Sequence, residues 1–154
     1  MIRESSIRQF FDAKIIKIMK EVGAGAGYVF NWPSSTKDLE ADVRGGKKLI
    51  IRPSLVVAPP ISLDFQQNKQ DLRGIYQIVF TAPLGFAITK ITDIADDVCS
   101  EFNISMFASG SYASIQDREI IMTAPAEKSP SFSGSDGVSV TVSVYYRINN
   151  VELY

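Results

Sequence analysis

Residues that could carry out chemistry are few in this 154-residue sequence, and the most reactive types are nearly absent. The chain contains no histidine and a single cysteine, Cys99. These counts exclude a Ser-His-Asp triad, a Cys-His pair, an HExxH zinc site and a Cys/His zinc cluster. They also exclude a disulfide within the chain. Any catalysis would therefore have to depend on carboxylates, hydroxyls or lysines.

Three short motifs resemble known sites but lack the context that those sites need. The Gly-Ala repeat at 23–27 follows a predicted helix and precedes a predicted strand, whereas a phosphate-binding loop needs a helix after it. Ser34 and Lys37 match an SxxK string, but no SDN or KTG partner occurs in the sequence. Residues 44–48 lack the spacing of a phosphate loop. We therefore expect no catalytic residue, no bound cofactor and no metal.

Carboxylates are the remaining candidates for acid–base chemistry. Asp93, Asp97 and Glu101 recur every four residues along a predicted helix, which places them on one outward face. Nothing nearby in the sequence would raise a carboxyl pKa, so we favour an ordinary solvated helix face. A surface for a partner is the alternative. Cys99 lies on the apolar side of the same helix, where a buried, inert thiol is expected.

Charge is distributed unevenly along the chain, although the formal net charge is only -1. Residues 1–90 hold 13 Lys/Arg and 8 Asp/Glu, whereas residues 91–154 hold 3 and 9, so the two parts carry +5 and -6. Such a split suits copies that meet head to tail, a positive surface against a negative one. The isoelectric point near 5.5 argues against a broad nucleic-acid-binding face.

The elements that must position these residues are two helices and several strands. Apolar residues at steps of three and four predict a helix that begins near Ser5 or Ser6, which would cap it, and ends at Gly23. The same pattern predicts a second helix over 88–102. Pro53 indicates a bulge or a sheet edge. The predicted strands cover residues 28–32, 48–58, 72–82, 115–124 and 137–149.

This order of elements predicts one domain over residues 1–154. The expected fold class is α+β, with two main helices packed on a mostly antiparallel or mixed sheet of about five strands. The final strand alternates between apolar and polar residues, which is typical of a strand with one buried face. No apolar run approaches the roughly 20 residues of a membrane span, so no membrane contact is expected.

Residues 71–85 include the F-x-x-P-x-G string from Phe80 to Gly85, and they are followed by the helix that contains residues 94–102. In these segments the sequence resembles the tail terminator-like proteins of long-tailed bacteriophages. The opening helix and the closing strand, residues 135–146, are also similar. The resemblance covers residues 3–148.

The resemblance implies a small structural subunit without enzymatic turnover. Such subunits form a homo-hexameric ring at the head-proximal end of the tail tube, where the ring ends polymerisation of the tail tube protein. The ring also provides the attachment surface for the head-completion or connector protein. DNA passes through the ring without specific binding. The expected location is the virion tail, and the host cytoplasm during assembly.

Two other functions remain open, a head–tail connector or tail-completion protein of the neck and, less favoured, a small carboxylate-dependent enzyme. Within a ring, the acidic helix face has two competing uses. It would either line the DNA passage and repel the polyanion, or meet basic residues of a neighbouring copy. The basic residues considered are Arg44, Lys47 and Lys48. Loops at 34–47, 66–71 and 129–136 are expected to contact partners.

Overall fold

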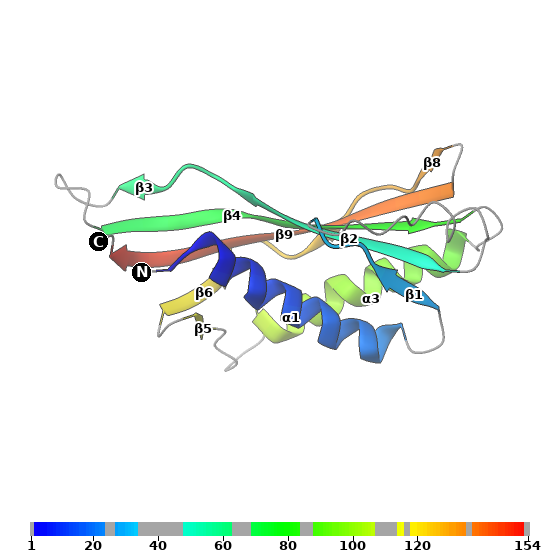
Figure 1. The fold of residues 1–154 in the computed structure, drawn as a ribbon, viewed down its shortest axis with the longest axis horizontal. Coiled ribbons are helices and arrows are strands. Elements are labelled where there is room, and N and C mark those ends of the chain that lie inside the picture. The colour runs from blue at the N-terminus through cyan, green and yellow to red at the C-terminus, as the bar shows by residue number, and fades with distance from the viewer. Residues whose placement is uncertain are drawn as a thin grey trace.

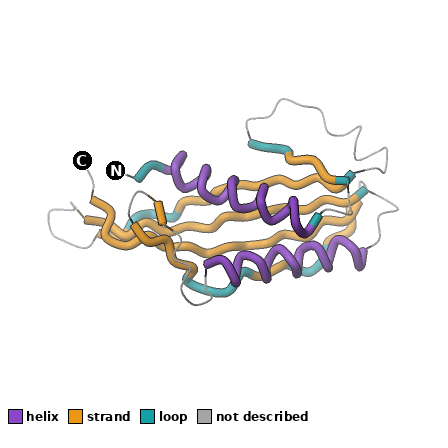
Figure 2. Tube along the Cα trace, turned by 90° about the horizontal axis from the view of Figure 1, so that it is seen from below, coloured by secondary structure: helices purple, strands orange, loops and turns teal. Residues whose placement is uncertain are grey.

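Two long helices lie side by side on one face of a sheet whose central strands run the length of the molecule (Figures 1 and 2). This computed structural model describes residues 2–23, 27–33, 48–62, 69–83, 88–106, 114–115, 118–134 and 137–152. The predicted α+β class, with two main helices on a mixed sheet, is confirmed. Within the described part of the chain, neither helix has the length and apolarity needed to cross a membrane.

The sheet is built around two long strands, β4 (Lys69–Ala82) and β9 (Gly137–Glu152), which pair antiparallel along nearly their whole length. On the far side of β4, β2 (Leu49–Val57) and then β3 (Ile61–Ser62) pair with it, also antiparallel. β1 (Tyr28–Phe30) pairs with β2, and this pairing is parallel.

Three short strands follow one another along the other side of β9. They are β6 (Arg118–Met122), β7 (Glu127–Lys128) and β8 (Phe132–Gly134), all antiparallel to β9. β5 (Ser114–Ile115) pairs with β6. The main path through the sheet is thus β1-β2-β4-β9-β6-β5, so the N-terminal strands form one border and the later strands the other.

The first helix, α1 (Glu4–Val22), begins earlier than expected. Arg3 occupies the N-cap position and makes no side-chain cap hydrogen bond, so the predicted cap at Ser5 or Ser6 is wrong. Both serines fall inside the first turn, where a side chain no longer occupies the capping position. The predicted end at Gly23 is confirmed, because its N–H donates to the Met19 carbonyl at 2.9 Å. A Cβ at Gly23 would lie 2.7 Å from Met19 Cε, so glycine relieves crowding there.

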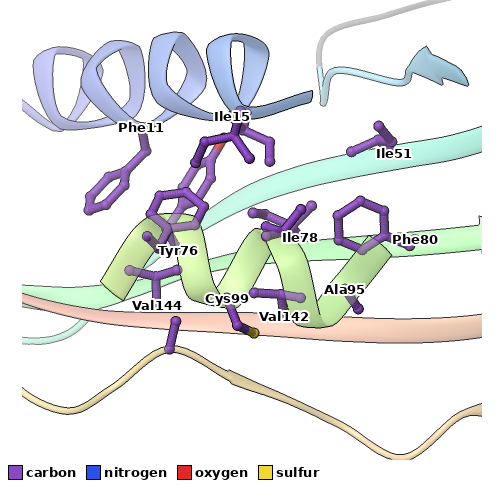
Figure 3. Packing of buried hydrophobic residues seen from close by; sticks show 14 of the residues in the cluster. Phe11, Ile15, Ile51, Tyr76, Ile78, Phe80, Ala95, Cys99, Val142 and Val144 are labelled. Carbon is purple, nitrogen blue, oxygen red and sulfur yellow. The ribbon is translucent and has the colours of Figure 1, made fainter. Parts of the chain in front are cut away.

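The core fills the space between the helices and the sheet (Figure 3). Alternate residues of β9 face the helices, as predicted from their period of two, while the intervening Ser139 and Thr141 lie half-buried on the other face. Phe11 of α1 stacks on Tyr76 of β4 with ring centroids 4.8 Å apart. The Tyr76 hydroxyl donates to Asp12 Oδ1 at 2.5 Å, which ties the first helix to the central strand.

Among the described residues, no strand lies beside Pro53 on the side of β2 that faces β1. Of the two predicted alternatives, the position at a sheet edge therefore holds for the described residues, and the bulge does not occur. The Leu49 N–H donates to the Gly27 carbonyl, and the Asn31 N–H donates to Ile51, so odd-numbered residues of β2 face β1. β1 ends opposite Ile51, and the nitrogen of Pro53 therefore points beyond that end. β2 passes through the proline with unbroken register, since no ladder hydrogen bond is lost on this side.

Candidate functional site

The three predicted acidic residues lie on α3 (Ile88–Met106), but they do not share one environment. Asp93 and Asp97 are exposed, whereas Glu101 is half-buried. An α-helix turns about 100° per residue, so each step of four residues advances about 40° around the axis. Glu101 is therefore displaced from the outward face towards α1. The expectation of one shared outward face holds for the first two residues and is wrong for Glu101.

A groove of about 280 Å³ separates α1 from α3. Partial burial, followed by repulsion from Lys17, lowers the pKa of Lys14 in this groove. The lining contains two lysines and two glutamates, so the groove lacks the single sign of charge that a phosphate or metal site needs. Among the described residues, no three acidic or cysteine side chains are grouped so that they could hold a metal ion. The groove is lined by Lys14, Lys17, Ile18, Glu21, Glu101 and Ser105.

Cys99 is buried on the inner side of α3, as predicted. Burial, reinforced by the nearby Asp96 carboxylate, raises the pKa of the thiol from 9.0 to about 11. The sulfur therefore remains protonated at neutral pH and is a poor nucleophile. Asp96 itself forms an ion pair with Lys128 of β7 at 2.7 Å, which fastens α3 to the border formed by β6, β7 and β8.

The basic residues considered from the sequence are only partly within the described structure. Lys48 is exposed immediately before β2. Arg44 and Lys47 lie outside the described residues, as do the loop at 34–47 and residues 66–68. Residues 69–71, expected to belong to a contact loop, form the start of β4. The third expected contact loop, 129–136, contains the edge strand β8, which the sequence analysis did not predict.

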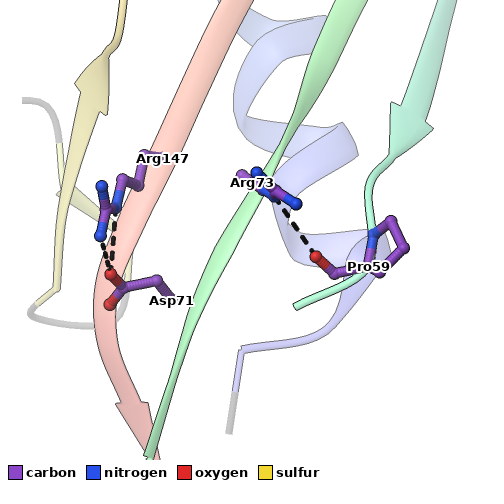
Figure 4. Close-up of polar contacts among 4 residues, drawn as sticks. All are labelled: Pro59, Asp71, Arg73 and Arg147. Carbon is purple, nitrogen blue, oxygen red and sulfur yellow. Dashed lines mark hydrogen bonds and ion pairs between the residues drawn. The ribbon is translucent and has the colours of Figure 1, made fainter. Parts of the chain in front are cut away.

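An ion pair between a buried aspartate and a partly exposed arginine, which sequence reasoning missed, joins one end of the central strands (Figure 4). Asp71 is 3% exposed and accepts hydrogen bonds from two guanidinium nitrogens of Arg147, with Nε at 3.0 Å. The register of β4 against β9 shifts at this point, between Gln70 and Leu72. Two residues further along β4, Arg73 Nε donates to the Pro59 carbonyl at 3.4 Å. A lone acid within a strand is a weak sequence signal, because its partner lies 76 positions away.

The uneven charge of the sequence becomes a separation between two borders of the molecule. We call α1, β1 and β2, together with Arg3 and Lys48 that directly precede α1 and β2, the basic edge. Residues 3–22, 28–30 and 48–57 of this edge contain 7 Lys/Arg and 3 Asp/Glu. We call α3, β6, β7 and β8 the acidic edge, and residues 88–106 and 118–134 there contain 3 Lys/Arg and 6 Asp/Glu. For the strands, the separation follows from the topology, which puts β1 and β2 on one side of the β4–β9 pair and β6, β7 and β8 on the other.

Comparisons with known proteins inform the fold and leave the function open. No family model matches the sequence. No curated protein matches it either. One solved structure, among 12 matching chains, superimposes on 100% of this chain and 99% of its own with a TM-score of 0.69. The name of that protein states no activity, and at 15% sequence identity the likeness shows the fold alone.

Proposed function

We propose that this protein is the subunit of a ring that caps the head-proximal end of a phage tail tube. The ring ends tube polymerisation and provides the surface to which the filled head attaches. Its place is the virion tail, and the host cytoplasm during assembly. The proposal starts from the resemblance of residues 3–148 to tail terminator-like proteins. The observation that carries it further is the separation of charge onto a basic edge and an acidic edge.

A closed ring needs a subunit with two different, complementary borders. Rotation about the ring axis presents the acidic edge of one copy to the basic edge of the next, with all helices on the same side. Complementary charge favours this order of copies and disfavours the meeting of two like edges. The hexameric number comes from the resemblance.

The charge layout also favours one of the two uses considered for the acidic helix. On the helix-covered face, α3 carries one Lys and four Asp/Glu, whereas α1 beside it carries four Lys/Arg and three Asp/Glu. Glu101 lines the groove together with Lys14 and Lys17 of α1. A bore lined by this face presents both signs to DNA and does not repel it uniformly. If the helices of neighbouring copies meet at the boundary, positive charges of one copy pair with negative charges of the next, so both signs of charge have a role. We therefore assign Asp93 and its neighbours to the boundary between copies.

The test is to add the purified protein to growing tail tubes made from the tube protein of the same genome. Electron microscopy is expected to show a six-fold ring at one end of each tube, and tube length is expected to stop increasing. Continued elongation with no bound ring contradicts the proposal. Binding only to tubes already capped, or only to filled heads, identifies a connector or tail-completion protein instead.

A further inference from the structure

β1 and β8 are edge strands on opposite borders of the sheet. Among the described residues, β1 pairs only with β2 and β8 pairs only with β9. Gly27 and Asn31 direct their backbone bonds towards β2. Because alternate residues of a strand face opposite sides, Tyr28 and Phe30 direct their N–H and C=O groups outward. Backbone groups of this kind at a border are ready to bond another strand.

The backbone of β8 shows the same alternation. On β9, Thr141 and Tyr145 accept hydrogen bonds from residues of the acidic edge, so its odd-numbered residues face that edge. Phe132 lies opposite Ser139 and therefore bonds inward. Ser133, the next residue, directs its N–H and C=O groups away from β9. Both borders thus offer outward-facing backbone groups.

We infer that β1 of one copy pairs antiparallel with β8 of the next copy, so that the sheet continues from subunit to subunit. β1 runs parallel to β2, which runs in the same direction as β9, and β8 runs against β9. A neighbour related by rotation in a ring therefore brings β8 against β1 in opposite directions. The parallel β1–β2 pair is what produces this match. The inference rests on the ring of the proposed function and names the surfaces that close it.

The register of the sheet supports the pairing. Phe132 lies opposite Ser139 of β9, which lies opposite Thr81 of β4. Thr81 lies opposite Ile50 of β2, which lies opposite Val29 of β1. If the neighbouring copy is not shifted along the strand direction, this row of paired residues continues from one copy into the next. Phe132 of one copy then lies beside Val29 of the next. Side chains in one row point to the same face of a sheet, so the two apolar groups meet.

The next row tests the hydrogen-bonding phase. Ser133 lies opposite Val138 of β9, which lies opposite Ala82 of β4, and on the other side Leu49 of β2 lies opposite Tyr28 of β1. Continuing the β2–β4 register by one position beyond Ile50 and Thr81 brings Leu49 into line with Ala82. Ser133 and Tyr28 are the residues whose backbone groups face outward, so they form a bonded pair across the boundary. The Phe132–Val29 row then forms a non-bonded pair, and the alternation required of an antiparallel ladder is kept.

Exposure and charge favour a second copy as the occupant of these borders. Phe132 is 73% exposed, the highest value among the large apolar side chains that the structure describes. α1 ends beside Tyr28, where Lys20 and Lys48 are exposed. On the other border, Asp93 is exposed one turn before the residue that pairs with β7. The pairing therefore brings opposite charges together while it covers Phe132.

Disulfide trapping tests the register directly. In a Cys99→Ser background, the pair Val29→Cys and Phe132→Cys is expected to give a ladder of covalent oligomers under mild oxidation, because non-bonded antiparallel pairs bring Cβ atoms within disulfide range. The matched control, Val29→Cys with Ser133→Cys, differs by one residue and points one thiol to the other face. It is expected to crosslink at least about tenfold less.

Trapping is carried out both in concentrated solution and on tail tubes. A ladder confined to the 29/132 pair supports the inference. Equal ladders from both pairs, or none from either in both settings, overturn it. A ring on tube ends that lacks the 29/132 crosslink overturns this interface and leaves the proposed function standing. If the unmodified protein never binds tubes, the proposed function fails, whatever the crosslinks show.

Discussion

The centre of the sheet and its two borders differ in how completely their bonding capacity is used. β4 and β9 form a long ladder that is covered by both helices on one face and continued by strands on both sides. β1 and β8 have three residues each and one described partner strand each. The centre therefore holds the fold together, whereas the borders, within the described residues, leave backbone groups and the apolar side chain of Phe132 for the pairing that we infer.

The largest expected difference compares the same substitution in the two regions. Phe80→Ala on β4 removes a side chain with no exposure and leaves a cavity, so the free energy of unfolding is expected to fall by about 3–5 kcal/mol. Phe132→Ala on β8 is expected to change it by less than about 0.5 kcal/mol. Denaturant unfolding of the isolated subunit measures both.

Phe132→Ala, which has the smaller effect on the free energy of unfolding, is expected to have the larger effect on ring assembly by folded subunits. The Phe132→Ala subunit is expected to fold normally and to form rings poorly, whereas Ile104→Ala, another exposed apolar residue, serves as the control and assembles normally. Loss of stability in Phe132→Ala comparable to that of Phe80→Ala would show that the border is part of the fold.

The fold could be predicted from sequence where periodicity decides it. Apolar residues of the last strand recur at period two, which sets the face that meets the helices. No such signal indicates that β1 runs parallel to β2. A strand of three residues could pair with β2 in either direction, and only the rest of the fold decides between them. Glu101 was misplaced because a spacing of four residues approximates a helical turn and the error accumulates.

The border residues were harder to predict than the core. Phe132 stands among serine, proline and glycine residues, where no pattern indicates a strand. The charge separation was visible along the chain, but its meaning depended on a topology that puts the two halves on opposite borders. The link between Tyr76 and Asp12 joins residues 64 positions apart, and local spacing gives no sign of it.

A third prediction concerns Cys99, where the core meets the acidic edge. Burial raises the pKa of its thiol from 9.0 to about 11, so the folded state retains the proton that the unfolded state loses. The contribution to stability is therefore present below pH 9 and is lost as the pH rises towards about 11. The full loss approaches roughly 2–3 kcal/mol for a shift of this size.

The comparison that isolates this effect is between the wild-type protein and Cys99→Ala. Unfolding free energies measured from pH 8 to 11 are expected to converge as the wild-type thiol loses its proton, because the variant lacks this titration. Parallel curves for the two proteins would show that the thiol titrates alike in the folded and unfolded states, and hence that it is not shielded by the core.

The smallest expected effect concerns exposed charges at the borders. Reversing Asp93 to Lys places a cation opposite Lys20 and Lys48 of the next copy, and each exposed pair is worth about 0.2–1 kcal/mol. Association is expected to weaken about threefold to tenfold, with less effect at high salt because screening shortens the reach of surface charges. Adding Lys20→Glu to the same chain restores opposite charges across every boundary, so association is expected to recover in part.

Asp97→Lys makes the same change in net charge one turn further along, about 40° nearer the groove, and is expected to weaken association less. Sedimentation at low and high salt measures all three. Equal weakening by Asp93→Lys and Asp97→Lys, with no recovery in the double variant, would mean that net charge governs association, and the assignment of Asp93 to the boundary would be wrong.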